Sequence, residues 1–538
     1  MAEQHFDGDE AHRGDIRGAF GRISEQDLAR RRTWRARLLT LAAIIGPGII
    51  VMVGDNDAGG VATYSQAGQN YGVSLLWVLL LLIPVLVVNQ EMVVRLGAVT
   101  GVGHARLIRE RFGRFWAWFS VGDLFVLDFL TIVTEFIGVD LSLGYFGVSR
   151  YLSVPIAAAC LVAITASGSF ERWERFMMVF VAANFLVIPL AVMAHPHGGP
   201  IVHHLFVPGI AGGLNSTSAL LVIAIVGTTV APWQLFFQQS NIIDKRITPR
   251  WINYERVDTV LGSIVTVVGA GAMICACAFA LDHSHFAGQF TNAGGVATAI
   301  GQRLGRVAGA FYAVVLLNAS LIGAAAVTLG TSYAFGDIFG TKHSLHRKAS
   351  ESVGFYAMFA GLVACAAGIV LIPHAPLGVI TTGVQALAGV LLPSASVFLL
   401  MLCNDKEVLG PWVNKMWLNA VATFIIGVLI ILSLILVITT IFTKIDVRVL
   451  LVVLGGALGV VLAVAGLVTA RRRRHAPAVV PSEAVRRETW RMPPLALLGR
   501  PPWTRARLWT MWTLRGYLVV AVGLLLVKAV QLSTGHRA

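Results

Sequence analysis

The chain has 538 residues, of which 56% are hydrophobic and only 13% are charged. Soluble globular proteins carry about 25% charged residues, so a soluble enzyme, a disordered chain and a small secreted scaffold are excluded. Lysine and arginine outnumber aspartate and glutamate by 42 to 28, a formal net charge of +14. The basic residues form short patches between apolar runs, as in the cytoplasmic loops of membrane proteins, so no nucleic-acid partner is expected. The composition predicts an integral membrane protein.

A membrane-spanning helix needs about 20 predominantly apolar residues. Twelve stretches meet this requirement, so the sequence predicts an all-α fold with about twelve membrane helices. In chain order they are 38–66, 73–97, 117–146, 150–169, 176–194, 214–240, 258–281, 308–338, 352–373, 377–402, 416–441 and 447–470. A further stretch, 516–532, contains Lys528 and is expected either as a short span or as an interfacial helix.

The loops on one side of the predicted spans are rich in arginine and lysine. They follow spans two, four, six, eight and twelve, on the side of a polar N-terminal arm, residues 1–37. Positive loops stay in the cytoplasm, so we expect a cytoplasmic N-terminus and a multi-pass protein of the plasma (inner) membrane. The arginine-rich and alanine-rich composition suggests a bacterial host. The basic linker 471–515 is expected to lie on anionic lipid headgroups, before a final apolar segment and tail, 516–538.

Two of the predicted spans are interrupted near the membrane midplane. The first contains GDNDAGG, with Asp55, Asn56 and Asp57 between glycines. A carboxylate at the centre of a membrane helix costs at least about 2.5–3.5 kcal/mol, whereas glycine lets the backbone unwind and free its carbonyls. A bound cation would explain both features. In the sixth span, Pro232 has no N–H to donate to the carbonyl of Thr228.

A membrane proline often produces only a kink, but these interruptions lie five spans apart. They therefore predict a transporter core, 38–402, of two inverted repeats, 38–194 and 214–402, followed by two additional helices in 403–470. Broken helices at corresponding positions are the best sequence indication of a transporter's substrate site. No nucleophile–base arrangement or cofactor motif occurs in the spans, so we expect neither an enzyme nor a cofactor.

At these interruptions the chain resembles the NRAMP (natural resistance-associated macrophage protein) divalent-metal transporters. The resemblance covers roughly residues 40–440 and rests on several motifs together. These are GPGIIVMVG, SLLWVLLL, RLGAVTG, TEFIG, VGTTVAPWQLF and VQALAGVLLPSASVFLLMLCNDKEVLGPWVN. It implies a LeuT-type fold of two five-helix inverted repeats, with discontinuous helices 1 and 6 and transport by alternating access.

The first interruption keeps the acid of the family motif and loses its asparagine. The Asp-Pro-Gly-Asn motif of the family aligns here with Asp57, Ala58, Gly59 and Gly60. A proline and an asparagine are thus replaced by the smaller alanine and glycine. We expect these residues to set the shape of the site, with Asp57 providing its main charge.

The second interruption lacks the thioether ligand of the family and its neighbouring imidazole. The Met-Pro-His motif aligns with Ala231, Pro232 and Trp233, and a second family histidine aligns with Gln238. The family glutamine of span ten is retained as Gln385. A thioether is a soft ligand, and its loss leaves a site made only of oxygen ligands.

These residues together give a predicted metal site that is supplied by spans one, six and ten. Its members are Asp57 for the charge, Asn56 or Asp55 and the freed carbonyls of Thr228 and Ala231 acting through water, and Gln385. On span three, Glu135 matches the family glutamate, whereas a family aspartate is replaced by Ile132. Glu135 and Asp128 are candidates for the cation pathway or for coupling.

Magnesium loses its waters reluctantly and binds through one or two carboxylates plus water. A wide, all-oxygen site therefore favours partly hydrated Mg²⁺, and the pattern is similar to the divergent NRAMP-related magnesium transporters. With most of the family's proton-carrying groups absent, we expect uptake with weak or no proton coupling. Three alternatives stay open: a Mn²⁺ or Ca²⁺ transporter of the same family, a cation-coupled organic-solute symporter, and a non-transporting sensor that uses the basic C-terminal segment.

Overall fold

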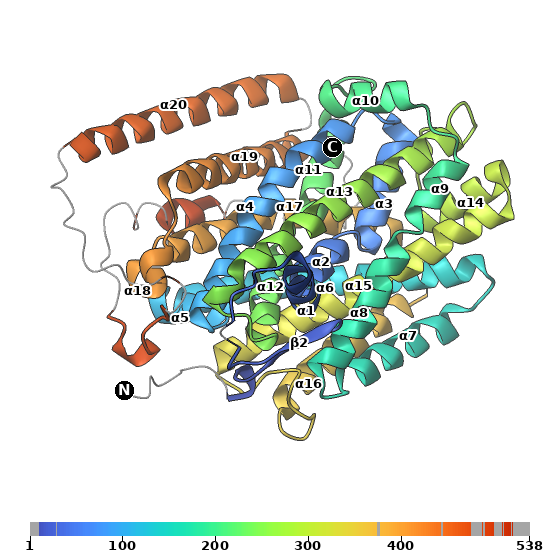
Figure 1. Ribbon diagram of the computed structural model, residues 1–538. Coiled ribbons are helices and arrows are strands. Elements are labelled where there is room, and N and C mark those ends of the chain that lie inside the picture. The colour runs from blue at the N-terminus through green and yellow to red at the C-terminus, as the bar shows by residue number, and fades with distance from the viewer. Residues whose placement is uncertain are drawn as a thin grey trace.

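The computed structural model describes residues 10–27, 29–373, 377–442, 445–474, 487, 490–499, 508, 511–517 and 519. These residues form a helical bundle, shown in Figure 1, with a two-stranded antiparallel hairpin near the N-terminus. The hairpin consists of β1 (Ile16–Gly18) and β2 (Gly21–Ile23). It belongs to the N-terminal arm, which in the structure ends at residue 33 because the first helix begins at Trp34. Below, the name refers to residues 10–33.

The first repeat begins after the N-terminal arm and ends before a peripheral helix, α10 (Gly198–Phe206). Its helices are α1 (Trp34–Ile44), α2 (Pro47–Gly54), α3 (Ala58–Tyr71), α4 (Leu76–Thr100), α5 (His104–Phe112), α6 (Arg114–Tyr145), α7 (Arg150–Thr165), α8 (Phe170–Asn184) and α9 (Val187–Met193). The first predicted span is therefore divided into three helices, and the fifth into two.

The second repeat has the same number of predicted spans. Its helices are α11 (Ser216–Thr229), α12 (Pro232–Asp244), α13 (Ile252–Leu281), α14 (Ala293–Leu304), α15 (Arg306–Phe339), α16 (Val353–Val370) and α17 (Leu377–Cys403). A short helix, α18 (Lys406–Leu409), leads to α19 (Met416–Ile441) and α20 (Val447–Arg474). α19 packs on α17, and α20 lies along α19 at the edge of the bundle (Figure 1).

Each of the twelve predicted spans coincides with a helix or with consecutive helices, so the all-α membrane fold is confirmed. By length and hydropathy, nine helical segments of the described residues qualify as spans, or ten when the pair α1 and α2, bent by 51°, counts as one. Two of the twelve predicted spans do not qualify. The third, α6, contains four carboxylate side chains, and the fourth, α7, has only 16 residues. Most of the stretch 516–532 lies outside the described residues.

The two repeats share a detail beyond their broken helices. A short helix precedes the third span of each repeat, α5 before α6 and α14 before α15, and the two long helices pack against each other. Gly113 and Gly305 form the junctions with φ of +96° and +97°, a conformation open mainly to glycine. The sequences there are Arg-Phe-Gly-Arg, 111–114, and Arg-Leu-Gly-Arg, 303–306. This local repeat in the sequence was not among the predicted features.

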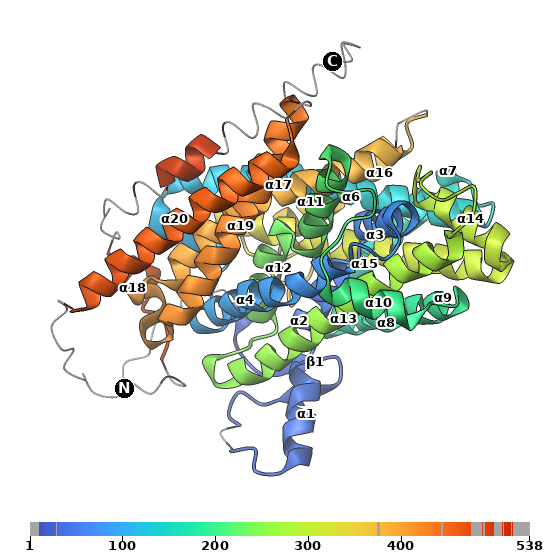
Figure 2. The same cartoon turned by 90° about the horizontal axis from the view of Figure 1, so that it is seen from above.

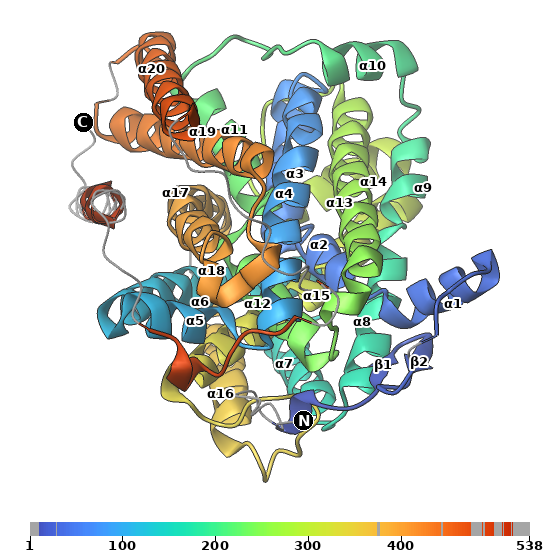
Figure 3. The ribbon, with the colours of Figure 1, turned by 60° about the vertical axis from the view of Figure 1, so that its left-hand side comes forward.

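The two breaks face each other in the middle of the bundle. α2 packs against α12 and α3 against α11, while α13 runs along both α2 and α3. α17 covers α11 and α3 from another side. Figures 2 and 3 show α2, α3, α11 and α12 enclosed by the longer helices. The break between α2 and α3 and the break between α11 and α12 are therefore brought together by packing.

The start of α2 is fixed by a carboxylate from the second repeat. Gly46 has φ of +152°, and Pro47 follows it as the first residue of α2. The side chain of Asp258 on α13 accepts N–H bonds from Gly46 (3.0 Å), Gly48 (2.7 Å) and Ile49 (3.3 Å). The unpaired N–H groups that begin a helix are satisfied in this way without water.

A buried ion pair holds the same end of α2. Nζ of Lys245, at the end of α12, lies 2.6 Å from Oε1 of Glu174 on α8 and donates to the carbonyl of Ile45 at 2.8 Å. Glu174 also accepts the N–H of Ala19, in the turn of the hairpin, at 2.6 Å. One ion pair therefore joins α8, α12, the N-terminal arm and Ile45, which lies two residues before the start of α2.

The basic loops gather on the side of the N-terminal arm, as the charge pattern predicted. Arg246 donates to the carbonyls of Ala11 and Asp15 in the arm. From the C-terminal linker, Arg491 donates to the carbonyl of Ala98 at the end of α4. The described part of the linker therefore lies on the same side as the arm.

The Glu174→Ala variant is expected to unfold at lower temperature, because it leaves the Lys245 ammonium buried without its partner. Removing one member of a buried ion pair typically costs about 3–5 kcal/mol. The matched control is Glu171→Ala, which removes the partly exposed partner of Arg175 one turn away. Thermal unfolding of both variants in detergent measures the difference. Equal midpoints would contradict a stabilising role for the buried pair.

Candidate metal-ion site

The break in the first span is a three-residue segment, Asp55–Asn56–Asp57. Asp55 caps the end of α2, and Asp57 is extended, with φ of −70° and ψ of −178°. Oδ1 of Asp57 accepts the N–H of Gly60 at 2.6 Å and so caps α3. A carboxylate at this position satisfies a free N–H group and balances the positive end of the helix dipole.

The break in the sixth span is formed by Val230, with φ of −131° and ψ of 80°, and by Ala231, which is extended. Pro232 begins α12 and has no N–H, so the carbonyl of Thr228 lacks its helical donor, as predicted. The carbonyl of Ala231 accepts a 3.3 Å bond from the N–H of Gln234 and is therefore not entirely free.

Oxygen atoms of both breaks converge on Gly60. A Cβ atom on this glycine would lie 2.7 Å from the carbonyl oxygen of Asp55, 3.1 Å from Oγ1 of Thr228 and 3.3 Å from Oδ1 of Asp57. Among the described residues, Oγ1 of Thr228 has no hydrogen-bond partner. We call this group of oxygens, with the side chain of Gln385, the central site.

Gln385 reaches the central site from α17. A Cβ atom on Gly59 would overlap its side-chain amide, so glycine is required for this contact. Nε2 of Gln385 has no hydrogen-bond partner among the described residues, and the side chain is buried. Span ten therefore contributes a polar group to the first turn of α3.

Asn56 is directed elsewhere. Its Nδ2 donates to the carbonyl of Thr266 on α13 at 3.2 Å and lies against Gly269. Its oxygen has no partner among the described residues. The amide is thus placed on the α13 side of the break, away from the contacts of Gly60.

Asp55 is fully buried beside the break. Its carboxylate interacts with the side chain of Gln234 on α12, although neither oxygen has a hydrogen-bond partner of normal geometry among the described residues. An unpaired buried carboxylate is costly. Asp55 is therefore a second buried acid whose negative charge a proton or a cation would neutralise.

Glu135 lies next to Asp57. Its Oε2 accepts the N–H of Ala58 at 3.1 Å, and the carboxyl groups of Glu135 and Asp57 are within hydrogen-bonding range. Gly323 of α15 packs directly on both. Two carboxylates at such a distance repel each other unless a proton or a cation lies between them.

Asp128 lies on the same face of α6, seven residues before Glu135. Its Oδ2 accepts the hydroxyl of Thr331 on α15 at 2.6 Å, whereas Oδ1 has no partner among the described residues. Asp140, on the other side of Glu135, is paired with Arg150 at 3.3 Å. The acids on α6 therefore differ: Asp128 and Glu135 face α15, and Asp140 forms an ion pair at the end of the bundle.

The wide cavity expected from the small residues is not open in this conformation. Asp57 is 3% exposed, and the ring of Trp233 closes over Gly54 at the end of α2. A narrow space of about 10 Å³ reaches Ala58 between α3 and α6. The structure thus represents a closed state of the central site.

The side chains that most often bind metal ions in proteins do not form a cluster in the described part of the chain. No group of three or more histidine, cysteine, aspartate or glutamate residues is arranged to hold a metal ion there. Met52 precedes the first break by three residues, but its sulfur lies 3.8 Å from the hydroxyl of Ser263 on α13. The ligands available at the central site are therefore oxygens, one of them the main-chain carbonyl of Asp55.

Sequence reasoning missed two hydrogen bonds that join the helices around the breaks. The hydroxyl groups of Tyr64 and Thr229 are 2.8 Å apart and connect α3 with α11. Gln90 on α4 donates to Gln234 on α12, also at 2.8 Å. Polar residues inside predicted spans were the available signal, but their partners are distant in sequence.

Comparison with known proteins gives a family match over most of the chain. A family model described as "Natural resistance-associated macrophage protein-like" matches residues 48–439. The chain is 24% identical over 421 residues to the divalent metal cation transporter MntH of Bacillus subtilis (strain 168), covering 74% of this chain and 93% of that protein. It is 31% identical over 271 residues to MntH of Verminephrobacter eiseniae (strain EF01-2), covering 47% and 59%.

Two solved structures have a similar fold. The Eremococcus coleocola manganese transporter, in complex with an aromatic bis-isothiourea substituted compound, aligns with a TM-score of 0.60 and 20% identity, covering 82% of this chain and 95% of that one. MhsT in complex with L-phenylalanine aligns with a TM-score of 0.50 and 16% identity, covering 75% and 100%. These similarities confirm the predicted LeuT-type fold. The family model covers well over half of the length of this chain, so the chain belongs to the NRAMP family.

Proposed function

We propose that this protein is a secondary transporter that moves divalent metal cations across the membrane into the cytoplasm, and that its main substrate is partly hydrated Mg²⁺. The observation that carries the proposal is the convergence of Asp57, Thr228 and the Asp55 carbonyl on Gly60, between two broken helices. Family membership and the names of the MntH relatives support transport of a divalent metal.

The electrostatics of the central site favour a cation. α2 and α11 end at the breaks, so the negative ends of their dipoles point toward the substrate, an arrangement that coordinates cations in transporters. Asp57 offsets the positive end of α3. Asp55 and Glu135 add further carboxyl groups without cationic partners at normal geometry in the described residues. A divalent ion would relieve the repulsion among these groups.

The ligand types distinguish the candidate ions. Soft sulfur ligands favour Mn²⁺, Fe²⁺ and Cd²⁺, whereas hard oxygen ligands suit Mg²⁺ and Ca²⁺. This chain has Ala231 where the family motif has methionine, and the sulfur of Met52 is directed to α13. Main-chain carbonyls, a hydroxyl, an amide and Asp57 remain, which supports an ion that keeps several waters.

Manganese is the second candidate. The relatives named MntH are divalent metal cation transporters, and the similar solved structure from Eremococcus coleocola is a manganese transporter. Carboxylate, carbonyl and water ligands also suit Mn²⁺. The comparisons thus favour Mn²⁺, whereas the side chains of this protein favour Mg²⁺.

An organic-solute symporter is the candidate of another class. MhsT, which shares the fold, was solved with L-phenylalanine. A carboxylate-bearing solute would be repelled by Asp55 and Asp57, whereas a divalent cation would be attracted. The charges of the central site therefore favour metal transport.

Purified protein in proteoliposomes loaded with a magnesium-sensitive dye is expected to give saturable Mg²⁺ entry, and Asp57→Ala is expected to reduce it to background. The variant removes the carboxylate from the convergent oxygens. Asp140→Ala is the matched control, because that acid pairs with Arg150 at the end of the bundle. Entry of Mn²⁺ without Mg²⁺ would establish the second candidate, and undiminished flux through Asp57→Ala would refute this central site.

The Ala231→Met variant is expected to raise the rate of Mn²⁺ and Cd²⁺ entry relative to Mg²⁺, because it places a soft ligand at the second break. The ratio of initial rates for each ion is the measurement. Ala231→Leu has similar bulk without sulfur and serves as the control. An identical change in both variants would show that volume, rather than ligand type, controls ion preference.

Metal entry is expected to proceed without acidification of the vesicle interior. A divalent cation gains about 4.6 kcal/mol per 100 mV of membrane potential, twice the value for a single charge. This free energy is enough to drive metal entry without coupled proton movement. The test is to follow the pH inside the vesicles with a dye while an imposed membrane potential drives metal entry. Strong metal-driven acidification would show that Asp57, Glu135 or Asp128 transfers protons despite the missing histidines.

A further inference from the structure

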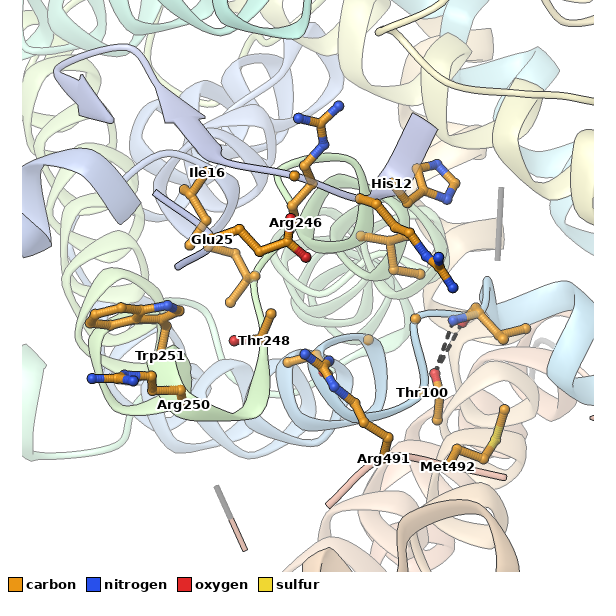
Figure 4. Close-up of a pocket in the computed structure, with 18 of the residues that line it drawn as sticks. His12, Ile16, Glu25, Thr100, Arg246, Thr248, Arg250, Trp251, Arg491 and Met492 are labelled. Atoms are coloured by element: carbon orange, nitrogen blue, oxygen red, sulfur yellow. Dashed lines mark hydrogen bonds between the residues drawn. The ribbon is translucent and has the colours of Figure 1, made fainter. Parts of the chain in front are cut away.

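A cavity of about 670 Å³ lies on the side of the N-terminal arm and shares no residue with the central site (Figure 4). Its wall is formed by the arm, the turn between α4 and α5, the loop between α12 and α13, and residues 491–494. Small-molecule sites typically have volumes of about 300–1,000 Å³. Segments far apart in sequence thus enclose a space of the size that a small organic or inorganic ligand needs. We call it the arginine cavity.

Three arginines of the wall are bonded to main-chain carbonyls. Arg246 donates to Ala11 and Asp15, Arg250 to Ala29, and Arg491 to Ala98. Among the described residues, none of the three forms an ion pair. Elsewhere in the chain Arg95, Arg111 and Arg256 are paired with carboxylates. A carbonyl accepts a hydrogen bond but cancels no charge, so the cavity has an excess of positive charge.

Part of this charge is buried. Burial lowers the pKa of the Arg246 guanidinium and that of the Arg491 guanidinium below the usual range. Both residues lie outside the membrane-spanning helices. Asp244, Asp15 and Glu25 act on Arg246, and Glu25 acts on Arg491, but none of these carboxylates forms an ion pair with either guanidinium in the described residues. Removing a guanidinium from water costs free energy, and a bound anion would offset that cost.

Two carboxylates also belong to the wall. Asp27 is held by Arg31 at 2.7 Å and is thereby neutralised. Glu25 extends toward the middle of the cavity from the arm, opposite Arg491 (Figure 4). It offsets only part of the charge of the arginines, and it opposes an entering anion. A ligand with several negative charges is therefore favoured over a single carboxylate.

The arginine cavity is unsuited to the transported ion, because the arginines repel a divalent cation. Guanidinium groups instead match the geometry and charge of phosphate. We propose that the arginine cavity binds a phosphate-bearing anion from the cytoplasmic side, with Arg246, Arg250 and Arg491 as its recognition groups. The bound anion ties the N-terminal arm to the α12–α13 loop and to the C-terminal linker.

A calorimetric titration of the purified full chain with tripolyphosphate, in metal-free buffer with EDTA, tests the proposal without measuring transport. We expect saturable binding. Arg491→Gln is expected to weaken it about tenfold, the loss typical of one charge-assisted hydrogen bond. Arg250→Gln is expected to act in the same direction. Arg246 holds the arm through three hydrogen bonds, whereas Arg250 and Arg491 each donate to a single carbonyl, so variants of these two arginines disturb the fold least.

Glu25→Gln is expected to tighten the binding of tripolyphosphate, because it removes the opposing charge. A gain in affinity cannot result from misfolding. Arg35→Gln is the control, since Arg35 is exposed on α1 and does not line the cavity. Absence of saturable binding, or affinities unchanged in both Arg491→Gln and Glu25→Gln, would overturn the proposal.

The same titration in lipid nanodiscs identifies the source of the phosphate. If the natural occupant is a lipid headgroup, phosphatidylglycerol in the disc will compete with tripolyphosphate in the wild type. If it is a soluble anion such as ATP, discs with and without phosphatidylglycerol will give the same affinity, and ATP will displace tripolyphosphate. Both results support a phosphate site and differ only in its ligand.

Discussion

A helix that is interrupted inside a hydrocarbon layer exposes backbone groups that lipid cannot solvate, and much of this structure serves to satisfy them. At the first break, Asp57 accepts the N–H of Gly60 and Glu135 accepts the N–H of Ala58. The hydroxyl of Thr266 donates to the carbonyl of Met52. Among the described residues, the hydroxyl of Thr228 is left without a partner, and it lies with the carbonyl of Asp55 and Oδ1 of Asp57 around Gly60. The requirement for hydrogen bonds thus also produces the candidate metal-ion site.

The position of the break depends on charges at the opposite end of α2. Asp258 caps the start of this helix, and the Lys245–Glu174 pair holds Ile45, two residues before that start. Because α2 has only eight residues, its two ends are fixed together. The N-terminal arm is bonded to the same ion pair through Ala19. Movement of α2 during alternating access would therefore have to disturb contacts of the arm.

Charge separates two regions of the molecule. Carboxylates and carbonyl oxygens dominate the central site, whereas arginines bonded to neutral carbonyls dominate the cavity beside the arm. The first environment attracts a divalent cation, and the second attracts an anion. Under the proposed function, ligand type at the central site decides between Mg²⁺ and Mn²⁺. The missing thioether at Ala231 is the difference from the family motif that removes a soft ligand.

The sequence by itself determined the membrane class, the twelve helical stretches, the two breaks and the family. These features depend on local composition: apolar length defines a span, and glycine, proline and intramembrane acids mark an interruption. The sequence also identified Asp57, Gln385 and Glu135, because they match a motif or are unusual inside a span.

Only the tertiary structure decided which of the candidate groups meet. Asn56 and Asp57 are neighbours in sequence, but the unwound backbone directs Asn56 to α13 and Asp57 to Gly60. The roles of Asp258, Lys245 and Gln234 depend on contacts across more than one hundred residues or on a break whose geometry the sequence does not specify. Side-chain direction at an irregular turn is set by packing against distant helices, so it could be read only from the folded chain.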